Sequence, residues 1–368
     1  TVEAYGEGFV WDTYASGAAA SYSDSGRVDN LTVRRCEGEF AADFRGPKNC
    51  DFQGIKAFLN GRGAVRFQGK AFTGNDETTQ CALRGFQIHD NGQSTAADGW
   101  GLVMDNTTRY VVADGHLDFN PRGAIEWRRT IGTSGADGSN QGEYKAIVAR
   151  NNGDNADCDA IIGTQNSGDL KAASLSGILL QNNYNTNPDQ KQLFVEGCDE
   201  LQASHITARL GPSVAMHFKN CTQAQLDHLL ADSNGSATPS SGTPHGIWIE
   251  GGDGHLDTYT ASNSKTNSTH SGYELAITGS PNHWTIGNGE LDANADGHEI
   301  TLASTAYRKV LFGGKTVFRG DPEYRPEVAV AASANQTLVI PWTALVLGRV
   351  RLNGSAGAGS IDKITPPT

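Results

Sequence analysis

A short alternating pattern of apolar and polar residues recurs along the chain, and each copy matches the two-residue period of a β-strand. The apolar residue that begins each copy follows the previous one after 23 to 36 residues. These first inward-facing residues are Leu102, Ile125, Ile161, Leu193, Met216, Ile247, Leu275 and Ile300. A repeat of this length built from strands indicates a solenoid, in which each coil contacts only its neighbours.

A second strand follows each first strand, and a polar turn that often carries asparagine follows the second. The apolar residues that mark the second strand are Val112, Ile147, Leu175, Ala203, Leu226, Leu256, Ile286 and Val310. The turn asparagines are Asn91, Asn120, Asn152, Asn183, Asn234, Asn263 and Asn294. Stacked asparagine side chains can hydrogen-bond along a ladder, and asparagine tolerates the left-handed backbone of a tight turn.

These patterns predict an all-β fold, a right-handed parallel β-helix that occupies residues 1–320. A leucine-rich repeat would need its Leu/Asn consensus and a helical repeat would need a 3.6-residue period, and neither is present. The proline-containing segment Asp321–Pro326 interrupts the pattern. Residues 321–368 are therefore expected to form a small C-terminal β-strand segment that caps the solenoid or mediates assembly.

Charge and hydropathy restrict the partners. The formal net charge of the 368 residues is −12, which argues against a nucleic-acid partner because such a partner requires a basic face. The chain has no run of about 18 apolar residues, so membrane insertion is not expected.

The cysteines and acidic loops do not indicate a metal site. The six cysteines lack the spacing of a zinc site. Cys198 and Cys221 occupy the same place in adjacent coils and are expected to stack inside, with a disulfide between them left open. Because the acidic loops Asp154–Asp159 and Asp292–Asp296 do not match the calcium-binding loop, and no phosphate-binding or dinucleotide-binding motif occurs, no metal or cofactor is expected.

The residues that alternate with the inward ones should face outward and form two columns on one wall. The first outward column is Val103, Glu126, Ile162, Phe194, His217, Trp248, Ala276 and Thr301. The second is Asp105, Arg128, Thr164, Glu196, Lys219, Glu250, Thr278 and Ala303. Several consecutive coils thus carry carboxylates, cations and aromatic rings on the same wall, which is the residue mixture that holds a sugar polymer.

Glu196 and Glu250 lie two coils apart with Lys219 between them, so their Cβ atoms should be about 9–10 Å apart. Flexible side chains could bring the carboxyls within the roughly 6.5–9.5 Å used by inverting glycosidases. We therefore expect Glu196 and Glu250 to be catalytic, with Glu126 as a third candidate. A plain charge ladder of Glu and Lys on adjacent strands is the alternative interpretation.

Six further residues are candidates for substrate binding. Aromatic rings would form platforms for sugar rings, and charged or imidazole groups would bind hydroxyls. The candidates are Asp105, Arg128, Phe194, His217, Lys219 and Trp248. A lone histidine is also commonly incidental, whereas a tryptophan on an outer sheet face usually marks a contact site.

The coil pattern from about Val28 to Phe318 resembles the pectate-lyase-like β-helix proteins, and among them the bacteriophage tailspikes. The opening residues 5–8 (YGEG) and the strand-rich C-terminal tail resemble them too. That resemblance implies a homotrimer, an extracellular or virion location, and cleavage of a host surface polysaccharide by Asp/Glu pairs. The polygalacturonase-type motif is not matched: Asp157 and Asp159 are a faint echo of its Asp pair, and no Gly-His-Gly occurs.

Three functions remain open. The first is an endo-acting depolymerase that hydrolyses a bacterial surface polysaccharide. The second is a polysaccharide lyase or epimerase acting on a uronate polymer, in which Lys219, His217 or Arg128 would neutralise the carboxylate and abstract a proton. The third is a non-catalytic glycan-binding adhesin.

Overall fold

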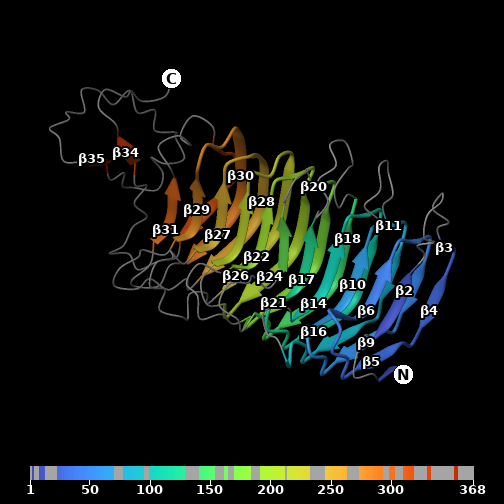
Figure 1. The fold of residues 1–368 in the computed structure, drawn as a ribbon. Coiled ribbons are helices and arrows are strands. Elements are labelled where there is room, and N and C mark those ends of the chain that lie inside the picture. Colours follow the sequence, from blue (N-terminus) through green and yellow to red (C-terminus); the bar gives the residue numbers. More distant parts are fainter. Residues whose placement is uncertain are drawn as a thin grey trace.

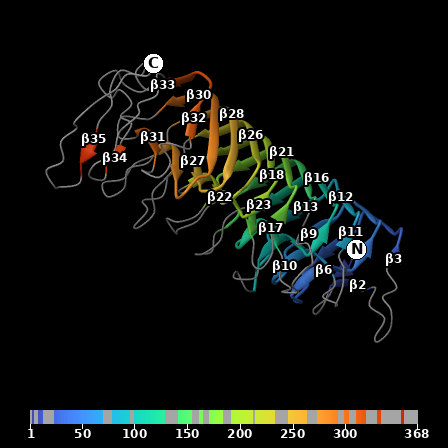
Figure 2. The same cartoon turned by 90° about the horizontal axis from the view of Figure 1, so that it is seen from above.

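The computed structural model shows a stack of parallel strands that runs from one end of the molecule to the other (Figures 1 and 2). The residues it describes are 2–3, 8–12, 23–69, 78–94, 99–128, 141–153, 161–164, 170–183, 191–211, 214–232, 245–262, 273–292, 298–302, 310–318, 330–332 and 352–354. Every pairing between strands in these ranges is parallel, as a solenoid of successive coils requires.

Two long sheets form the main walls of the stack. The first sheet contains β2 (Phe9–Asp12), β6 (Phe40–Arg45), β10 (Gly63–Gln68), β14 (Trp100–Asp105), β17 (Gly123–Arg128), β19 (Ile161–Thr164), β22 (Lys191–Glu196), β25 (Val214–Lys219), β27 (His245–Glu250), β29 (Tyr273–Thr278) and β31 (His298–Leu302), in that order.

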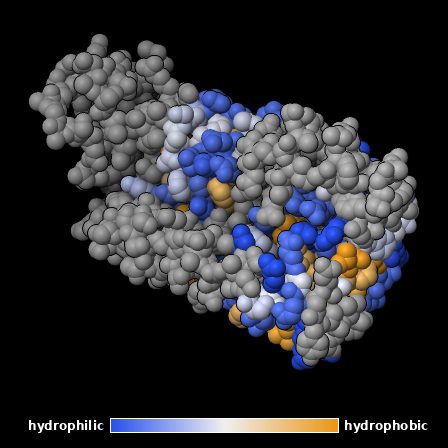
Figure 3. Space-filling model, viewed as in Figure 1, coloured by the Kyte–Doolittle hydropathy of each residue, from blue (hydrophilic) through white to orange (hydrophobic). Residues whose placement is uncertain are grey.

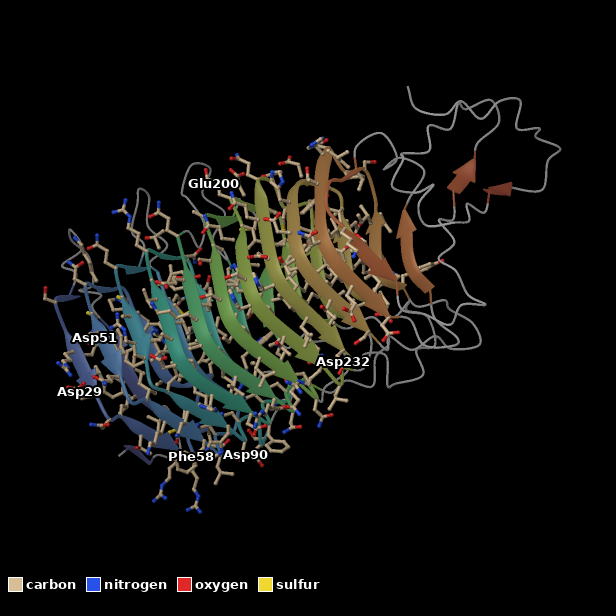
Figure 4. All side chains as sticks on the ribbon, turned by 180° about the vertical axis from the view of Figure 1, so that it is seen from behind. Asp29, Asp51, Phe58, Asp90, Glu200 and Asp232 are labelled. Atoms are coloured by element: carbon tan, nitrogen blue, oxygen red, sulfur yellow. The ribbon has the colours of Figure 1, made fainter. Side chains whose placement is uncertain are left out.

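The second sheet contains β1 (Val2–Glu3), β4 (Arg27–Asp29), β5 (Thr32–Arg34), β8 (Asp51–Gln53), β9 (Lys56–Phe58), β12 (Ala82–Arg84), β13 (Gln87–His89), β16 (Val111–Asp118), β18 (Glu143–Arg150), β21 (Ser174–Gln181), β24 (Gln202–Arg209), β26 (Ala224–Asp232), β28 (Asp253–Ser262), β30 (His283–Asp292), β32 (Val310–Phe312) and β33 (Thr316–Phe318). Figure 4 shows this sheet from behind, with Glu200 and Asp232 at opposite edges.

Short strands join the two long sheets at one edge. They are β3 (Ser23–Asp24), β7 (Pro47–Lys48), β11 (Thr78–Thr79) and β15 (Thr107–Thr108), and further along the stack β20 (Leu170–Lys171) and β23 (Cys198–Asp199). Near the C-terminus β34 (Val330–Ala332) and β35 (Leu352–Gly354) pair only with each other among the described strands. In the described part of the chain, no helix is long and apolar enough to span a membrane.

The register predicted for the first strands is confirmed. All eight first inward residues pair in one column along the first sheet, from Leu102 to Ile300. The six whose side chains are described have no exposed surface and belong to one continuous apolar core. The first sheet therefore presents its alternate residues to the outside, as the alternating pattern requires.

The register predicted for the second strands is confirmed in six coils and wrong in two. Tyr144, and not Ile147, aligns with Val112 and Leu175. Both Tyr144 and Ile147 are buried, because the strand bends at Ala146, whose φ is 52°. Because apolar residues on both sides of the bend face the core, the apolar pattern of the sequence did not indicate which of them aligns with Val112. In the last coil Phe312, and not Val310, aligns with Ile286.

The bend in the second sheet stacks residues with left-handed backbone from coil to coil. This column runs through Asn30, Gly54, Gly85, Asp114, Ala146, Gly177, His205 and His228, with φ values between 49° and 69°. Such a conformation costs about 1–3 kcal/mol at a residue other than glycine unless surrounding structure enforces it. Its recurrence at one place in each coil shows that the parallel pairing on both sides holds the bend.

The predicted asparagine ladder is present and begins one coil earlier than predicted. Each side-chain amide donates to the carbonyl oxygen of the next, through Asn60, Asn91, Asn120, Asn152 and Asn183 at 2.7, 2.8, 2.9 and 3.1 Å. Asn183 then donates to Gln192 Oε1 at 3.1 Å. The other predicted members, Asn234, Asn263 and Asn294, lie outside the described residues. The ladder satisfies a row of buried amides along the corner between the two sheets.

The predicted internal cysteine stack is also present. Cys198 and Cys221 are buried free thiols in adjacent coils, next to the bridge between Asp199 and Thr222. Burial raises the pKa of the Cys198 thiol to about 12. Both cysteines therefore act as small apolar residues of the core.

We expect Asn120→Ala to lower the free energy of unfolding by about 2 kcal/mol, because it removes a buried amide whose neighbours lose their partners. Asn120 has no exposed surface and bonds to both Asn91 and Asn152. The measurement is urea denaturation followed by circular dichroism. Gln225→Ala removes an exposed amide from β26 and serves as the control, with an expected change within about 0.5 kcal/mol. Equal stability of the two variants would show that the ladder contributes nothing.

Candidate active site on the outer wall

Three adjacent strands of the first sheet, β22, β25 and β27, carry the predicted candidates on their outer side. The register places Phe194, His217 and Trp248 in one column, which we call the aromatic row. It places Glu196, Lys219 and Glu250 in another column, which we call the charged row. The residues between the two rows, Val195, Phe218 and Ile249, are buried in the core.

One outer wall therefore carries all four residues on which the predicted site depends, as predicted. They are Glu196, Lys219, Trp248 and Glu250. Figure 3 views the molecule from the same side as Figure 1, and the described surface there is mainly hydrophilic with small apolar areas. In the first sheet these three strands stand seventh to ninth of eleven, toward the C-terminal end of the stack, where Figure 1 labels β22 and β27. A wall of this kind offers polar and aromatic groups along the axis of the solenoid.

The aromatic row is stacked and rigid. The imidazole of His217 lies parallel to the Trp248 ring, with 3.9 Å between centroids and 2° between planes. Phe194 lies on the other side of His217 at 5.1 Å and 34°. The Trp248 indole Nε1 donates to Thr278 Oγ1 at 2.7 Å. Because neighbouring strands are about 4.8 Å apart, rings at the same position in adjacent coils must contact one another.

The charged row holds its two carboxylates in different ways. Lys219 Nζ lies 2.8 Å from Glu196 Oε1. The hydrogen bond that Lys219 donates to Glu196 is the largest cause of the raised pKa of Lys219, and the charges of Glu196 and Glu250 add to it. Glu250 Oε2 lies 3.1 Å from His217 Nε2. The side chains of Glu196, Lys219 and Glu250 are each about one third exposed, at 30, 32 and 30%.

His217 faces outward from the sheet but is only 3% exposed. Burial is the largest cause that lowers its pKa, to about 2, and the positive charges of Lys191 and Lys219 add to the effect, followed by His245. The imidazole is therefore neutral at physiological pH. Its Nδ1 is buried and has no hydrogen-bond partner.

Lys191, His245 and Tyr273 extend this site beyond the predicted residues. Lys191 Nζ lies 5.0 Å from the centroid of the Phe194 ring. His245 meets the Trp248 ring edge to face at 5.1 Å, and Tyr273 lies 5.8 Å from His245. All three residues stand at the first position of their strands. The repeated motif in the sequence was defined one residue later, so this outward position was missed.

The remaining candidates lie on the same wall but nearer the N-terminal end, and the structure does not bring them to the charged row. Glu126 belongs to the column of the aromatic row, but the strand β19 lies between it and Phe194. Two coils correspond to about 10 Å. Asp105 pairs with Arg128, whose side chain lies outside the described residues.

Asp105 and Glu126 are also less accessible than expected, at 1 and 7% exposed. Asp105 accepts a hydrogen bond from Asn106 Nδ2 at 2.9 Å. Beside them, Val103 packs in an outer apolar cluster with Phe40 and Trp100. At this end the outward-facing side chains are therefore covered, because they pack on one another.

A buried ion cluster occupies the neighbouring coils. Arg66 donates to both carboxylate oxygens of Asp43, at 3.0 and 2.8 Å, and to Glu39 at 3.0 Å. Arg45 donates to the same Asp43 at 2.8 Å, and the Arg66 guanidinium lies 4.6 Å from the centroid of the Phe40 ring. Both oxygens of the Asp43 carboxylate thus accept hydrogen bonds from arginine side chains, which indicates a structural role.

The described residues contain no group of three or more His, Cys, Asp or Glu side chains placed to hold a metal ion. The acidic segments at 154–159 and 293–296 lie outside the described residues.

The long parallel sheets and stacked corners define the chain as a parallel β-helix protein. No protein-family model matches the chain, and no curated protein matches it. Among solved structures it is similar to the Dettilon tailspike protein, with 12% identity and a TM-score of 0.44, over 80% of this chain and 60% of that one. The chain thus spans 60% of the length of that tailspike.

It is also similar to an alginate lyase from Paenibacillus sp. str. FPU-7, with 10% identity and a TM-score of 0.29, over 83% of this chain and 79% of that one. Both TM-scores are below 0.5.

The pKa of His217 makes folding stability depend on pH. The folded-state pKa of about 2 lies below the ordinary value of 6.5, so between these values the unfolded chain binds a proton that the folded chain does not. Stability must therefore fall as the pH drops below about 6.5. We expect His217→Phe, which keeps a ring in the stack, to lose this dependence, which amounts to about 2 kcal/mol at about pH 5.

The measurement is urea unfolding at a series of pH values for the wild type and the variant. His116→Phe, at an exposed position of β16, is the control and should keep the wild-type slope. Parallel stability curves for the wild type and His217→Phe would show that His217 takes up a proton normally in the folded protein.

Proposed function

We propose that this protein is an endo-acting polysaccharide depolymerase that binds a glycan along the outer wall of the first sheet and hydrolyses it with Glu196 and Glu250. The observation that carries the proposal is the side-by-side arrangement of the aromatic row and the charged row on three consecutive coils. The substrate is a bacterial surface polysaccharide in this proposal.

The aromatic row supports a carbohydrate substrate. The apolar C–H faces of sugar rings pack on aromatic rings, while their hydroxyls bond to charged groups beside those rings. Trp248 and Phe194 are both half-buried, and the charged row lies two residues further along the same strands. An elongated wall suits a polymer better than a small ligand, which usually occupies an enclosed pocket.

The spacing of the two carboxylates supports hydrolysis. Glu196 and Glu250 both pair with Lys219 in the strand register, from opposite sides, so they are two coils apart, which is about 10 Å along the axis. Inverting glycosidases separate their acid and base by about 6.5–9.5 Å to leave room for water. Side-chain torsions of the two glutamates can supply the difference, and the two residues share the roles of acid and base.

A polysaccharide lyase is the second candidate, and the surroundings of His217 favour it. The charges of Lys191 and Lys219 both act on this neutral imidazole, and such cations could neutralise the carboxylate of a uronate sugar while a base removes the neighbouring proton. Product analysis separates the two reactions. A lyase forms an unsaturated sugar end that absorbs ultraviolet light, whereas hydrolysis forms a new reducing end without that absorbance.

The proposal extends to the whole molecule. We propose that residues 1–320 bind and cleave the glycan and that residues 321–368 cap the solenoid or mediate a homotrimer, in an extracellular or virion protein. The support is the sequence resemblance to tailspikes described above. Light scattering of the purified protein would measure the number of chains in the assembly.

We expect Glu196→Gln and Glu250→Gln each to lower kcat by about 10²- to 10⁴-fold, because each removes one partner of the acid–base pair. The measurement is the release of reducing ends from a panel of bacterial surface polysaccharides. The matched control is Glu143→Gln on β18, a glutamate that also accepts from a lysine, Lys145, at 2.9 Å, but on the second sheet. It should retain full activity.

If both active-site variants cleave polymer at the wild-type rate, these glutamates are not catalytic. If the wild type binds a glycan and cleaves none in the panel, the protein is an adhesin and the proposed hydrolysis is wrong.

We expect Trp248→Ala to weaken glycan binding about tenfold, because it removes the widest ring of the aromatic row. Binding is measured by calorimetry in the Glu196→Gln background, where the polymer is not consumed. Phe119→Ala is the control, since Phe119 is 55% exposed at a different corner of the coil. Equal loss of affinity in the two variants, or none in either, would place the glycan elsewhere.

A further inference from the structure

We propose that His217 is a positioning residue: a neutral imidazole, clamped between two aromatic rings, that fixes the carboxyl group of Glu250 through its Nε2. This inference rests on the proposed function, because it assumes that Glu250 takes part in the reaction. It gives His217 a role different from the substrate contact that the sequence suggests.

The geometry leaves the His217 ring little freedom. Trp248 lies parallel to it at 3.9 Å on one side, and Phe194 lies at 5.1 Å on the other. His217 and Glu250 lie on adjacent strands, β25 and β27, and the bond from Nε2 to Glu250 Oε2 measures 3.1 Å. A carboxyl group on a flexible glutamate side chain is thereby bonded to a ring that packs between two other rings.

Burial separates His217 from direct contact with a polymer. Only 3% of the residue is exposed, whereas 30% of the Glu250 side chain is exposed. Of the two bonded partners, Glu250 is therefore the one that can touch a substrate. His217 acts through it.

Burial and the positive charges around the imidazole keep it neutral. The titratable groups that act on it are Lys191, Lys219 and His245, and Glu250 contacts its Nε2. Burial, followed by the two lysines and His245, lowers the pKa of His217 to about 2. The bond to Glu250 is therefore a hydrogen bond from a neutral ring, whereas the contact between Lys219 and Glu196 is an ion pair.

The unpartnered Nδ1 indicates where the single proton of the neutral ring resides. A buried N–H without an acceptor is rarer and costlier than a buried acceptor without a donor. Because Nδ1 has no partner and Nε2 contacts Glu250, the proton belongs on Nε2. The imidazole then donates to Glu250 Oε2.

Two variants separate the hydrogen bond from the ring stack. His217→Phe keeps a ring between Trp248 and Phe194 but has no donor for Glu250. His217→Gln places an amide N–H near the position of Nε2 but has no ring. We expect His217→Phe to lower kcat about tenfold to a hundredfold, the effect of losing one bond to a charged group, with KM within about twofold.

His217→Gln should recover most of kcat. Wild-type kcat in His217→Phe would overturn the proposal. So would equal losses in both variants, which would show that a restored donor at this position does not restore activity.

A measurement that does not involve activity separates this inference from the proposed function. Nitrogen-15 NMR of the labelled wild type should show a neutral His217 with its proton on Nε2 down to about pH 4; the resonance is assigned by its absence in His217→Gln. A charged ring or a proton on Nδ1 at that pH would overturn the positioning role. If Glu250→Gln is fully active while the NMR result holds, the proposed catalysis fails and the hydrogen bond is only structural.

Discussion

Parallel pairing in register, at about 4.8 Å per coil, is the constraint on which the rest of this structure depends. It turns residues that are 23 to 36 positions apart in the chain into direct neighbours. The core then consists of columns of like residues, such as the one from Leu102 to Ile300. A shift of one residue in any coil would move its apolar set to the outer wall and its charges into the core.

The corners keep this register from drifting. Left-handed residues stack in the bend of the second sheet, and amide side chains bond from coil to coil along the ladder from Asn60 to Asn183. A slipped coil would break both the backbone turn and the ladder, and would leave buried amides without partners. These polar groups therefore set the alignment of strands that the apolar core alone would specify only loosely.

The same constraint decides what could be predicted from the sequence. The column of first inward residues and the two rows of the site followed from alternation, because one strand face is buried and the other is not. The inward position of Tyr144 could not be predicted in this way. At a bend, residues on both sides of the bend face inward, so alternation does not indicate the register there. Lys191, His245 and Tyr273 lie at strand starts, where no alternating pattern precedes them.

The burial of His217 could not be predicted from the sequence for a different reason. Alternation shows to which side of a sheet a residue points, but not whether its neighbours cover it. Whether His217 is covered depends on the rings of Phe194 and Trp248. Their tilt and their distance relative to the His217 ring follow from the tertiary structure. Likewise, the columns placed Glu250 beside Lys219 and did not reveal its diagonal bond to His217 on the neighbouring strand.

This diagonal bond makes the two carboxylates unequal, although their places in the repeat are equivalent. Glu196 is held by a charged ammonium group, whose attraction weakens as salt is added and ends when either group loses its charge. Glu250 is held by a neutral ring that is almost fully buried, so this contact is insensitive to salt. An acid and a base that work at the same pH need different surroundings. A repeating fold supplies equivalent positions. Here the difference arises because one coil carries histidine at this position and its two neighbours carry Phe194 and Trp248.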